Sequence, residues 1–181
     1  MTKIRFSTAL QVIDAFPHVR DEFEGEPLNL APVAFVQHLL QSKGEGKAVT
    51  FCAFLLTRHD ALKWLCQSLR AQQTVYTAKD EALLAIAESW ARTPSENIRQ
   101  AALQAAMASG FRTAPAFAAA AVGWSGGNLS NSAENPVPPP AHMTGQAVKT
   151  GLILAALAAP MAEQANKLKQ IVVLGLTFLD T

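Results

Sequence analysis

The fold is decided by the stretch Lys47-Ala48-Val49-Thr50-Phe51-Cys52-Ala53-Phe54-Leu55-Leu56. Apolar residues recur at helical spacing on two faces of this stretch, with Val49 and Cys52 on one face and Phe51 and Phe54 on the other. A helix that is hydrophobic all round is buried on every side. The stretch therefore predicts a central, nearly inaccessible helix against which the other elements pack.

Before this helix, the sequence predicts two more helices. One runs from about Pro32 to Ser42, and a short one is capped by Ser7 and ends before Pro17. Residues 18–29 between them are acidic and are interrupted by glycine and proline, so they are predicted to form a loop.

After the central helix, threonines placed before apolar stripes mark further helix starts. Thr57 is predicted to cap a helix over 58–72, and Thr77 to begin the next. The clearest local signal is Thr93-Pro94-Ser95-Glu96, which predicts an N-cap threonine, a proline at the first helical position and a glutamate that closes a capping box. That helix is expected to end at Ser109, with Gly110 in the left-handed position.

Three more helices complete the chain. One opens at Thr113 and ends near Trp124, one runs from Thr144 to about Ala158, and the last runs from Pro160 to about Phe178. The total is eight or nine helices and no strand. The sequence thus predicts an all-α fold, either a compact bundle or an irregular HEAT-like array.

Residues 125–143, called here the 125–143 segment, differ from the rest of the chain. Ser125-Gly126-Gly127-Asn128 stops a helix, and Pro136-Val137-Pro138-Pro139-Pro140 must be extended, as in polyproline II. Such a segment either folds back over the domain as a strap or projects as a ligand for a groove in a partner. We favour the strap, because an apolar helix follows directly. Trp124, Pro138, Pro139 and Pro140 are the candidate protein-binding residues.

Composition bounds the class of protein. The 181 residues suit one domain over 1–181, half of them are apolar, and the net charge is +1. The fifteen basic residues are scattered, which argues against nucleic-acid binding. The longest apolar run, 151–161, is too short to cross a bilayer, so no membrane insertion is expected. The first residues lack the apolar core of a signal peptide, which predicts a soluble, cytoplasmic protein.

No catalytic constellation can be assembled from the sequence. The four histidines, at 18, 38, 59 and 142, lie on separate elements without metal-ligand spacing. Cys52 and Cys66 lie mid-helix among apolar residues and are predicted to be small core side chains. Asp60 fits a capping role at a helix start. We therefore assign no catalytic, cofactor-binding or metal-binding residue, and expect no cofactor.

Four sets of residues resemble an uncharacterised, all-helical bacterial family, a domain of unknown function that is sometimes encoded near type VI secretion genes. These sets are Ala61-Leu62-Lys63-Trp64-Leu65-Cys66, Pro94-Ser95-Glu96-Asn97 with Arg99, Trp124-Ser125-Gly126-Gly127, and Val137-Pro138-Pro139-Pro140 with His142. The resemblance covers about Val33 to Ala156. It implies a bacterial, cytoplasmic origin and an accessory role in secretion or signalling, and it brings no catalytic residues with it.

The sequence therefore predicts a non-enzymatic helical module that interacts with a protein partner, and it leaves a homodimer open. The alternative is a small enzyme or small-molecule-binding protein whose site is assembled from residues distant in sequence. An enzyme requires titratable groups that converge in a pocket, whereas an interaction module exposes an apolar or extended surface.

Overall fold

The computed structural model describes residues 5–72, 74–130 and 134–179. These residues form nine α-helices, one 3-10 helix and no strand, which confirms the all-α prediction and comes close to the predicted count. The elements are α1 (Ala9–Ala15), η1 (Pro17–Phe23), α2 (Pro32–Gln41), α3 (Glu45–Leu55), α4 (Arg58–Ala71), α5 (Ala78–Arg92), α6 (Glu96–Ser109), α7 (Ala114–Gly123), α8 (Met143–Leu157) and α9 (Met161–Leu176).

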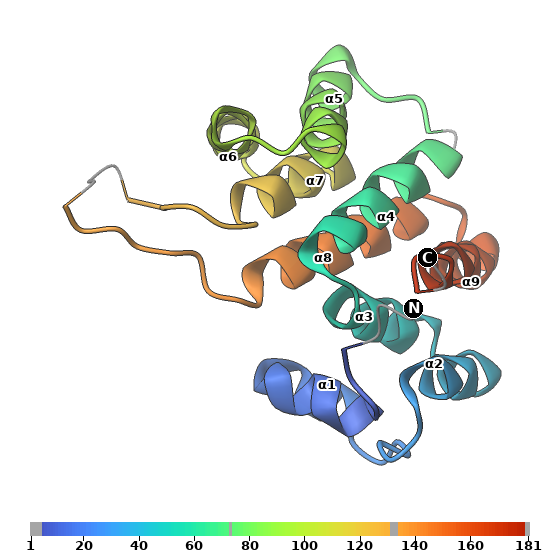
Figure 1. Ribbon diagram of the computed structural model, residues 1–181. Coiled ribbons are helices and arrows are strands. Elements are labelled where there is room, and N and C mark those ends of the chain that lie inside the picture. Colours follow the sequence, from blue (N-terminus) through green and yellow to red (C-terminus); the bar gives the residue numbers. More distant parts are fainter. Residues whose placement is uncertain (1–4, 73, 131–133, 180–181) are drawn as a thin grey trace.

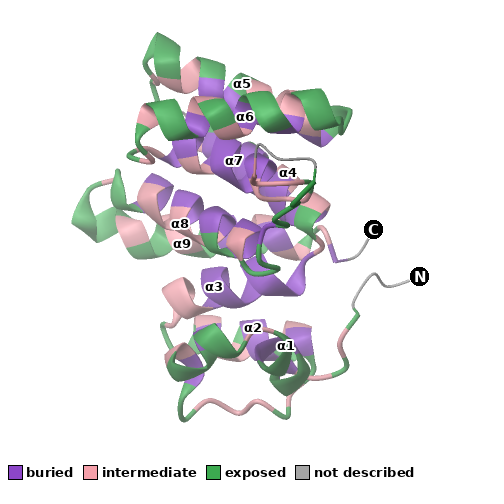
Figure 2. Ribbon diagram, turned by 90° about the vertical axis from the view of Figure 1, so that its left-hand side faces the viewer, coloured by how far each residue is buried: buried purple, intermediate pink, exposed green. Residues whose placement is uncertain are grey.

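The helices lie in stacked layers (Figures 1 and 2). At one end α5 and α6 pack on α7. Helices α4, α8 and α9 form the middle, and α3 separates them from α1 and α2 at the other end. Helix α7 is built mostly of alanine, and every residue from Ala118 to Gly123 is buried. Small side chains let its neighbours α5, α6 and α8 approach closely, so the layers form one continuous core.

Helix α3 is the central helix predicted from its sequence. All of its residues from Ala48 to Leu55 are buried. It contacts α1 and α2 on one side and α8 and α9 on the other (Figure 1). Apolar side chains on both faces are therefore covered by different parts of the chain, as a helix without a polar face requires.

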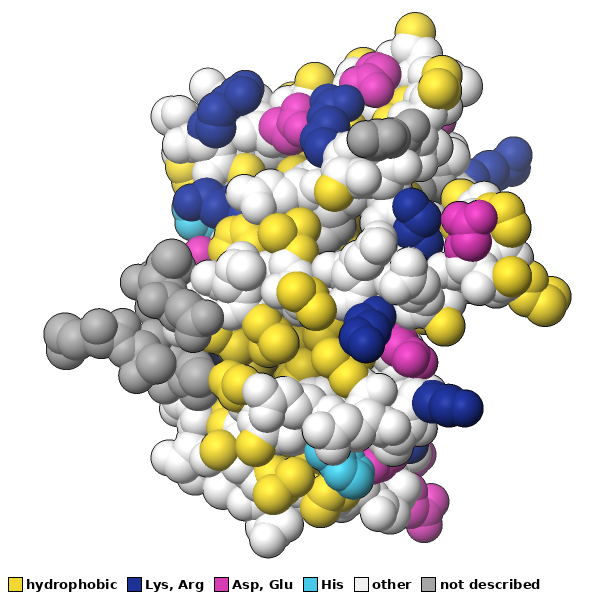
Figure 3. All heavy atoms as spheres, turned by 90° about the vertical axis from the view of Figure 1, so that its right-hand side faces the viewer, with side chains coloured by type: hydrophobic (Ala, Val, Ile, Leu, Met, Phe, Trp, Pro, Cys, Tyr) yellow, Lys and Arg dark blue, Asp and Glu magenta, His cyan; other side chains and the backbone are white. Residues whose placement is uncertain are grey.

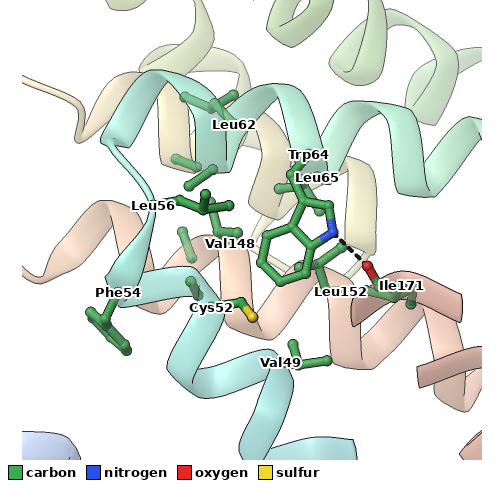
Figure 4. Packing of buried hydrophobic residues seen from close by; sticks show 14 of the residues in the cluster. Val49, Cys52, Phe54, Leu56, Leu62, Trp64, Leu65, Val148, Leu152 and Ile171 are labelled. Carbon is green, nitrogen blue, oxygen red and sulfur yellow. Dashed lines mark hydrogen bonds between the residues drawn. The ribbon is translucent and has the colours of Figure 1, made fainter. Parts of the chain in front are cut away.

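Trp64 on α4 ties the last helix to this core. Its fully buried indole points between α3 and α8, and its Nε1–H donates a hydrogen bond of 2.7 Å to the carbonyl of Ile171 on α9 (Figure 4). The backbone of Gly175 lies directly against the ring, because a Cβ there would approach the indole to 2.8 Å. Tryptophan thus fills the core while its polar N–H is satisfied.

Several predicted helix starts are confirmed. Thr57, Thr77 and Thr113 each accept a hydrogen bond from a backbone N–H in the first turn of the helix that follows. Gly110 ends α6 with a φ of 73°, the left-handed conformation expected there.

Three local predictions were wrong. The first helix is capped by Thr8 rather than by Ser7, whose N–H instead donates to Gln11. Residues 17–23, predicted mostly as loop, form η1, because Pro17 presets the φ of a first helical turn. The cap of α6 is Ser95 rather than Thr93. Thr93 precedes a proline, which disfavours helical backbone at that position, so it ends α5, and the cap of the next helix lies two residues later.

Figure 3 shows one face of the molecule, on which acidic and basic side chains are scattered between apolar patches. No basic side chains gather there into a patch of the kind that binds a phosphate backbone. None of the helices in the described ranges is both long and apolar enough to cross a membrane.

Candidate functional site

The connection between α7 and α8 extends outward from the ends of both helices (Figure 1). Its two described arms are tied together near the middle. Leu129 N–H donates to the Val137 carbonyl at 2.8 Å, and the side-chain oxygen of Asn128 accepts from Val137 N–H at 2.6 Å and from Ser130 N–H at 2.9 Å. The extended arm is therefore held against the outgoing one by backbone and side-chain hydrogen bonds.

Arg99 on α6 fixes the base of this connection. Its guanidinium is almost fully buried and donates to the Gly123 carbonyl at 2.6 Å and to both carboxylate oxygens of Glu96 at 2.6 and 2.7 Å. The hydrogen bonds from Arg99 lower the pKa of the Glu96 carboxyl. Gly127 turns the chain over the guanidinium with a φ of 70°, and a Cβ at this position would lie 2.5 Å from Arg99 Nε. Only glycine fits there without displacing the arginine.

Two further helices hold the same turn. Arg58 at the start of α4 donates from Nη1 to the Ser125 carbonyl at 2.9 Å, and Thr144 on α8 donates from its hydroxyl to the Trp124 carbonyl at 2.9 Å. The last carbonyls of a helix have no partner within the helix. Side chains from α4, α6 and α8 satisfy the last carbonyl of α7 and the two carbonyls that follow it, so the base of the connection is held from three helices.

The predicted binding residues have different surroundings. Trp124 is half-buried and stacks on Phe111, with ring centroids 5.6 Å apart and planes at 23°. Pro139 is buried, whereas Pro138 and Pro140 are exposed. The segment thus rests on the protein through Pro139 and presents its neighbours to solvent, which combines features of the strap and of the projecting ligand. The strap prediction also covered residues 131–133, which lie outside the described residues.

The fold brings together two histidines that were predicted to lie on separate elements. The rings of His18 on η1 and His142 at the start of α8 have centroids 4.7 Å apart. Burial lowers the pKa of His18, the charge of His142 and of Lys149 lowers it further, and Glu22 opposes them. Lys149 also forms an ion pair with Glu22. No cue in the sequence links residues 18 and 142, because their contact depends on how η1 packs on α8.

Cys52, Cys66 and Asp60 have the structural roles that the sequence predicts, as core side chains and as a residue at a helix cap. Both cysteines are buried free thiols, and burial raises the pKa of each to about 12. Asp60 lies at the cap of α4, where its N–H donates to Thr57 Oγ1 at 3.1 Å and its carboxylate accepts from the same hydroxyl at 2.7 Å. Within the described ranges, no three His, Cys, Asp or Glu side chains gather as metal ligands do.

Comparison with known proteins identifies a family. A family model described as "Family of unknown function (DUF6931)" matches residues 35–179, so the chain belongs to this family. The match includes α3 to α9 and most of α2, together with the Arg99 anchor and the 125–143 segment, and it leaves out α1 and η1. No curated protein and no solved structure matches the chain.

Proposed function

We propose that this member of the DUF6931 family is a non-enzymatic interaction or accessory module that presents the 125–143 segment to a protein partner. The observation that carries the proposal is an extended loop on a rigid base, where side chains from three helices hold the turn at residues 124–127. Binding residues are commonly placed on loops that a rigid scaffold positions. Fixing the base before binding lowers the entropy that association must overcome.

The exposed residues of the segment indicate the chemistry of the partner. Val137 is 52% exposed, and Pro138 and Pro140 on either side of the buried Pro139 are also exposed. An extended, proline-rich strand has few backbone donors to satisfy and is typically bound by a groove lined with aromatic side chains. We therefore propose a protein partner with such a groove. The resemblance supports a bacterial, cytoplasmic setting and an accessory role beside a secretion apparatus.

Photo-crosslinking tests this proposal directly. A photoreactive amino acid at position 137 is expected to capture a protein in cells of the native host, which mass spectrometry then identifies. The same amino acid at position 75, where Val75 is 97% exposed on the α4–α5 connection, is the matched control. Capture of a second copy of this chain at position 137 would show that the segment makes a homodimer instead.

The captured protein is then purified and its affinity is measured. Val137→Asp and Pro140→Asp place a charge on the apolar contact surface, so each is expected to weaken binding about tenfold or more, the equivalent of about 1.4 kcal/mol. Val75→Asp is expected to leave the affinity unchanged. Equal affinities for all three variants would contradict the assignment of this segment as the binding surface.

A further inference from the structure

A cleft of about 600 Å³ lies between α4 and α5, away from the 125–143 segment. Charged side chains from both helices line it, and Phe178, which follows α9, forms part of its wall. Clefts of this volume hold small molecules, and those that do combine an apolar lining with a few polar groups that orient the ligand.

Polar ties fix the two walls of the cleft relative to each other. Arg70 on α4 donates to both carboxylate oxygens of Glu88 on α5, at 2.7 and 3.0 Å, and to Glu81 at 2.8 Å. Towards the other end of α4, His59 Nε2 lies 2.9 Å from the Ala91 carbonyl, within hydrogen-bond distance, and its ring packs edge-on against Trp90. The cleft is therefore preformed rather than opened by a ligand.

The charged side chains that line the cleft are Lys63, Arg70, Arg92, Asp60 and Glu88, which together carry a net charge of +1. Arg70 is paired with Glu88 and also with Glu81, and Asp60 accepts a hydrogen bond from the neutral Thr57 hydroxyl at the cap of α4. Lys63 and Arg92 also line the cleft, and neither has an ion-pair or hydrogen-bond partner among the described side chains. Lys63 is half-buried, which reduces its contact with water. The cleft thus offers two cations without a direct partner among the described residues, one on each wall.

Apolar groups lie beside these cations. Cys66, Ala91 and Phe178 contribute to the lining, and the raised pKa of the Cys66 thiol keeps that group neutral. An anion without an apolar part would leave this surface in contact with water. We propose that the cleft binds a small organic anion, a carboxylate on an apolar body, with the carboxylate between Lys63 and Arg92 and the apolar body against Phe178.

An NMR titration of the full chain with three probes tests this assignment. N-acetylphenylalanine carries both a carboxylate and an aromatic ring, its amide lacks the charge, and inorganic phosphate lacks the apolar body. N-acetylphenylalanine is expected to shift the backbone amide signals of residues 60–70 and 88–92 saturably. The amide and phosphate are each expected to bind about tenfold more weakly or worse, because each lacks one of the two contacts.

Variants locate the binding. Lys63→Met and Arg92→Met are each expected to weaken the binding of N-acetylphenylalanine about tenfold, because each variant loses one charge-assisted contact. Lys79→Met, which removes an exposed cation on α5 outside the cleft, is the matched control and is expected to have no effect. The proposal is overturned if no saturable shift occurs, if the amide or phosphate binds as tightly as the acid, or if all three variants behave alike.

Discussion

The guanidinium of Arg99 donates a hydrogen bond of 2.6 Å to the carbonyl oxygen of Gly123. This bond joins the first turn of α6 to the last residue of α7, and the same guanidinium is neutralised by Glu96 one turn earlier. One buried side chain therefore ends a helix, orders the following turn and satisfies its own charge.

Arg99→Met is expected to lower the free energy of unfolding by about 2–4 kcal/mol, because it leaves the buried Gly123 carbonyl without a donor and removes charge-assisted hydrogen bonds. Glu96→Gln is the milder comparison, since the Glu96 side chain is half-exposed and its amide still accepts a hydrogen bond. Urea denaturation of both variants measures the difference. Equal losses would show that the bond to Gly123 contributes little.

Two adjacent glycines offer a matched test of the turn. Gly127→Ala forces a left-handed residue to carry a Cβ and pushes it into Arg99, so it is expected to cost about 2–4 kcal/mol. Gly126→Ala meets nothing within 4 Å and is expected to stay within about 0.5 kcal/mol of the original protein. Thermal or urea unfolding of the two variants measures their free energies of unfolding. The prediction fails if Gly126→Ala lowers this free energy more than Gly127→Ala does.

Core truncation in α3 tests its central position. Phe51 is fully buried among aromatic rings, with Phe35 at 4.8 Å and Phe23 at 6.0 Å between ring centroids. Phe51→Ala is expected to cost about 3–5 kcal/mol through lost burial and the cavity that remains. Phe54→Ala, also buried, is expected to cost a similar amount. Val75→Ala on the exposed α4–α5 connection is the control with almost no effect. A loss below about 1 kcal/mol for both phenylalanine variants would contradict the central role.

The His18–His142 contact predicts a pH dependence of stability. Burial first, and then the charge of His142, lowers the pKa of His18 from its ordinary value of 6.5. As the pH is lowered, the His18 ring therefore takes up a proton in the unfolded chain before it does so in the native state. Because the unfolded chain binds more protons, the free energy of unfolding falls as the pH is lowered through 6.5. NMR titration of the His18 ring should give a pKa below 6.5, and His142→Gln should raise it. A pKa at or above 6.5 in the original protein would contradict this account.

The thiols are expected to be inert in the native protein. With the pKa of both cysteines at about 12, almost no thiolate is present at neutral pH, so iodoacetamide should alkylate them only as fast as the chain opens. Reductant and chelator are likewise expected to leave Tm unchanged, because the sequence offers no ligand set and the two cysteines are free. A drop in Tm of several degrees with either reagent would overturn the interpretation of the cysteines as free core side chains and of the histidines as lacking a metal.

Local signals in the sequence predicted local structure well. The two apolar faces of 47–56 identified the central helix, and threonines and glycine marked several helix ends, because caps depend on residues within one turn. Thr93 shows the limit, since two competing cap residues stood next to one proline. The contacts of Arg99 with Gly123 and of His18 with His142 join residues distant in sequence, and no spacing rule encodes them. The cleft between α4 and α5 was missed because it depends on how these two helices and Phe178 pack, which their sequence spacing does not give.

The position of α3 has a consequence for how the protein is made. Its apolar faces are covered on one side by α8 and α9, and the indole that joins α9 to the core pairs with a residue 107 positions later. A ribosome therefore releases this helix long before its covering exists, and contacts so distant in sequence form slowly. In the interval the nascent chain exposes an uncovered apolar helix, the kind of surface that makes incompletely folded chains prone to aggregate.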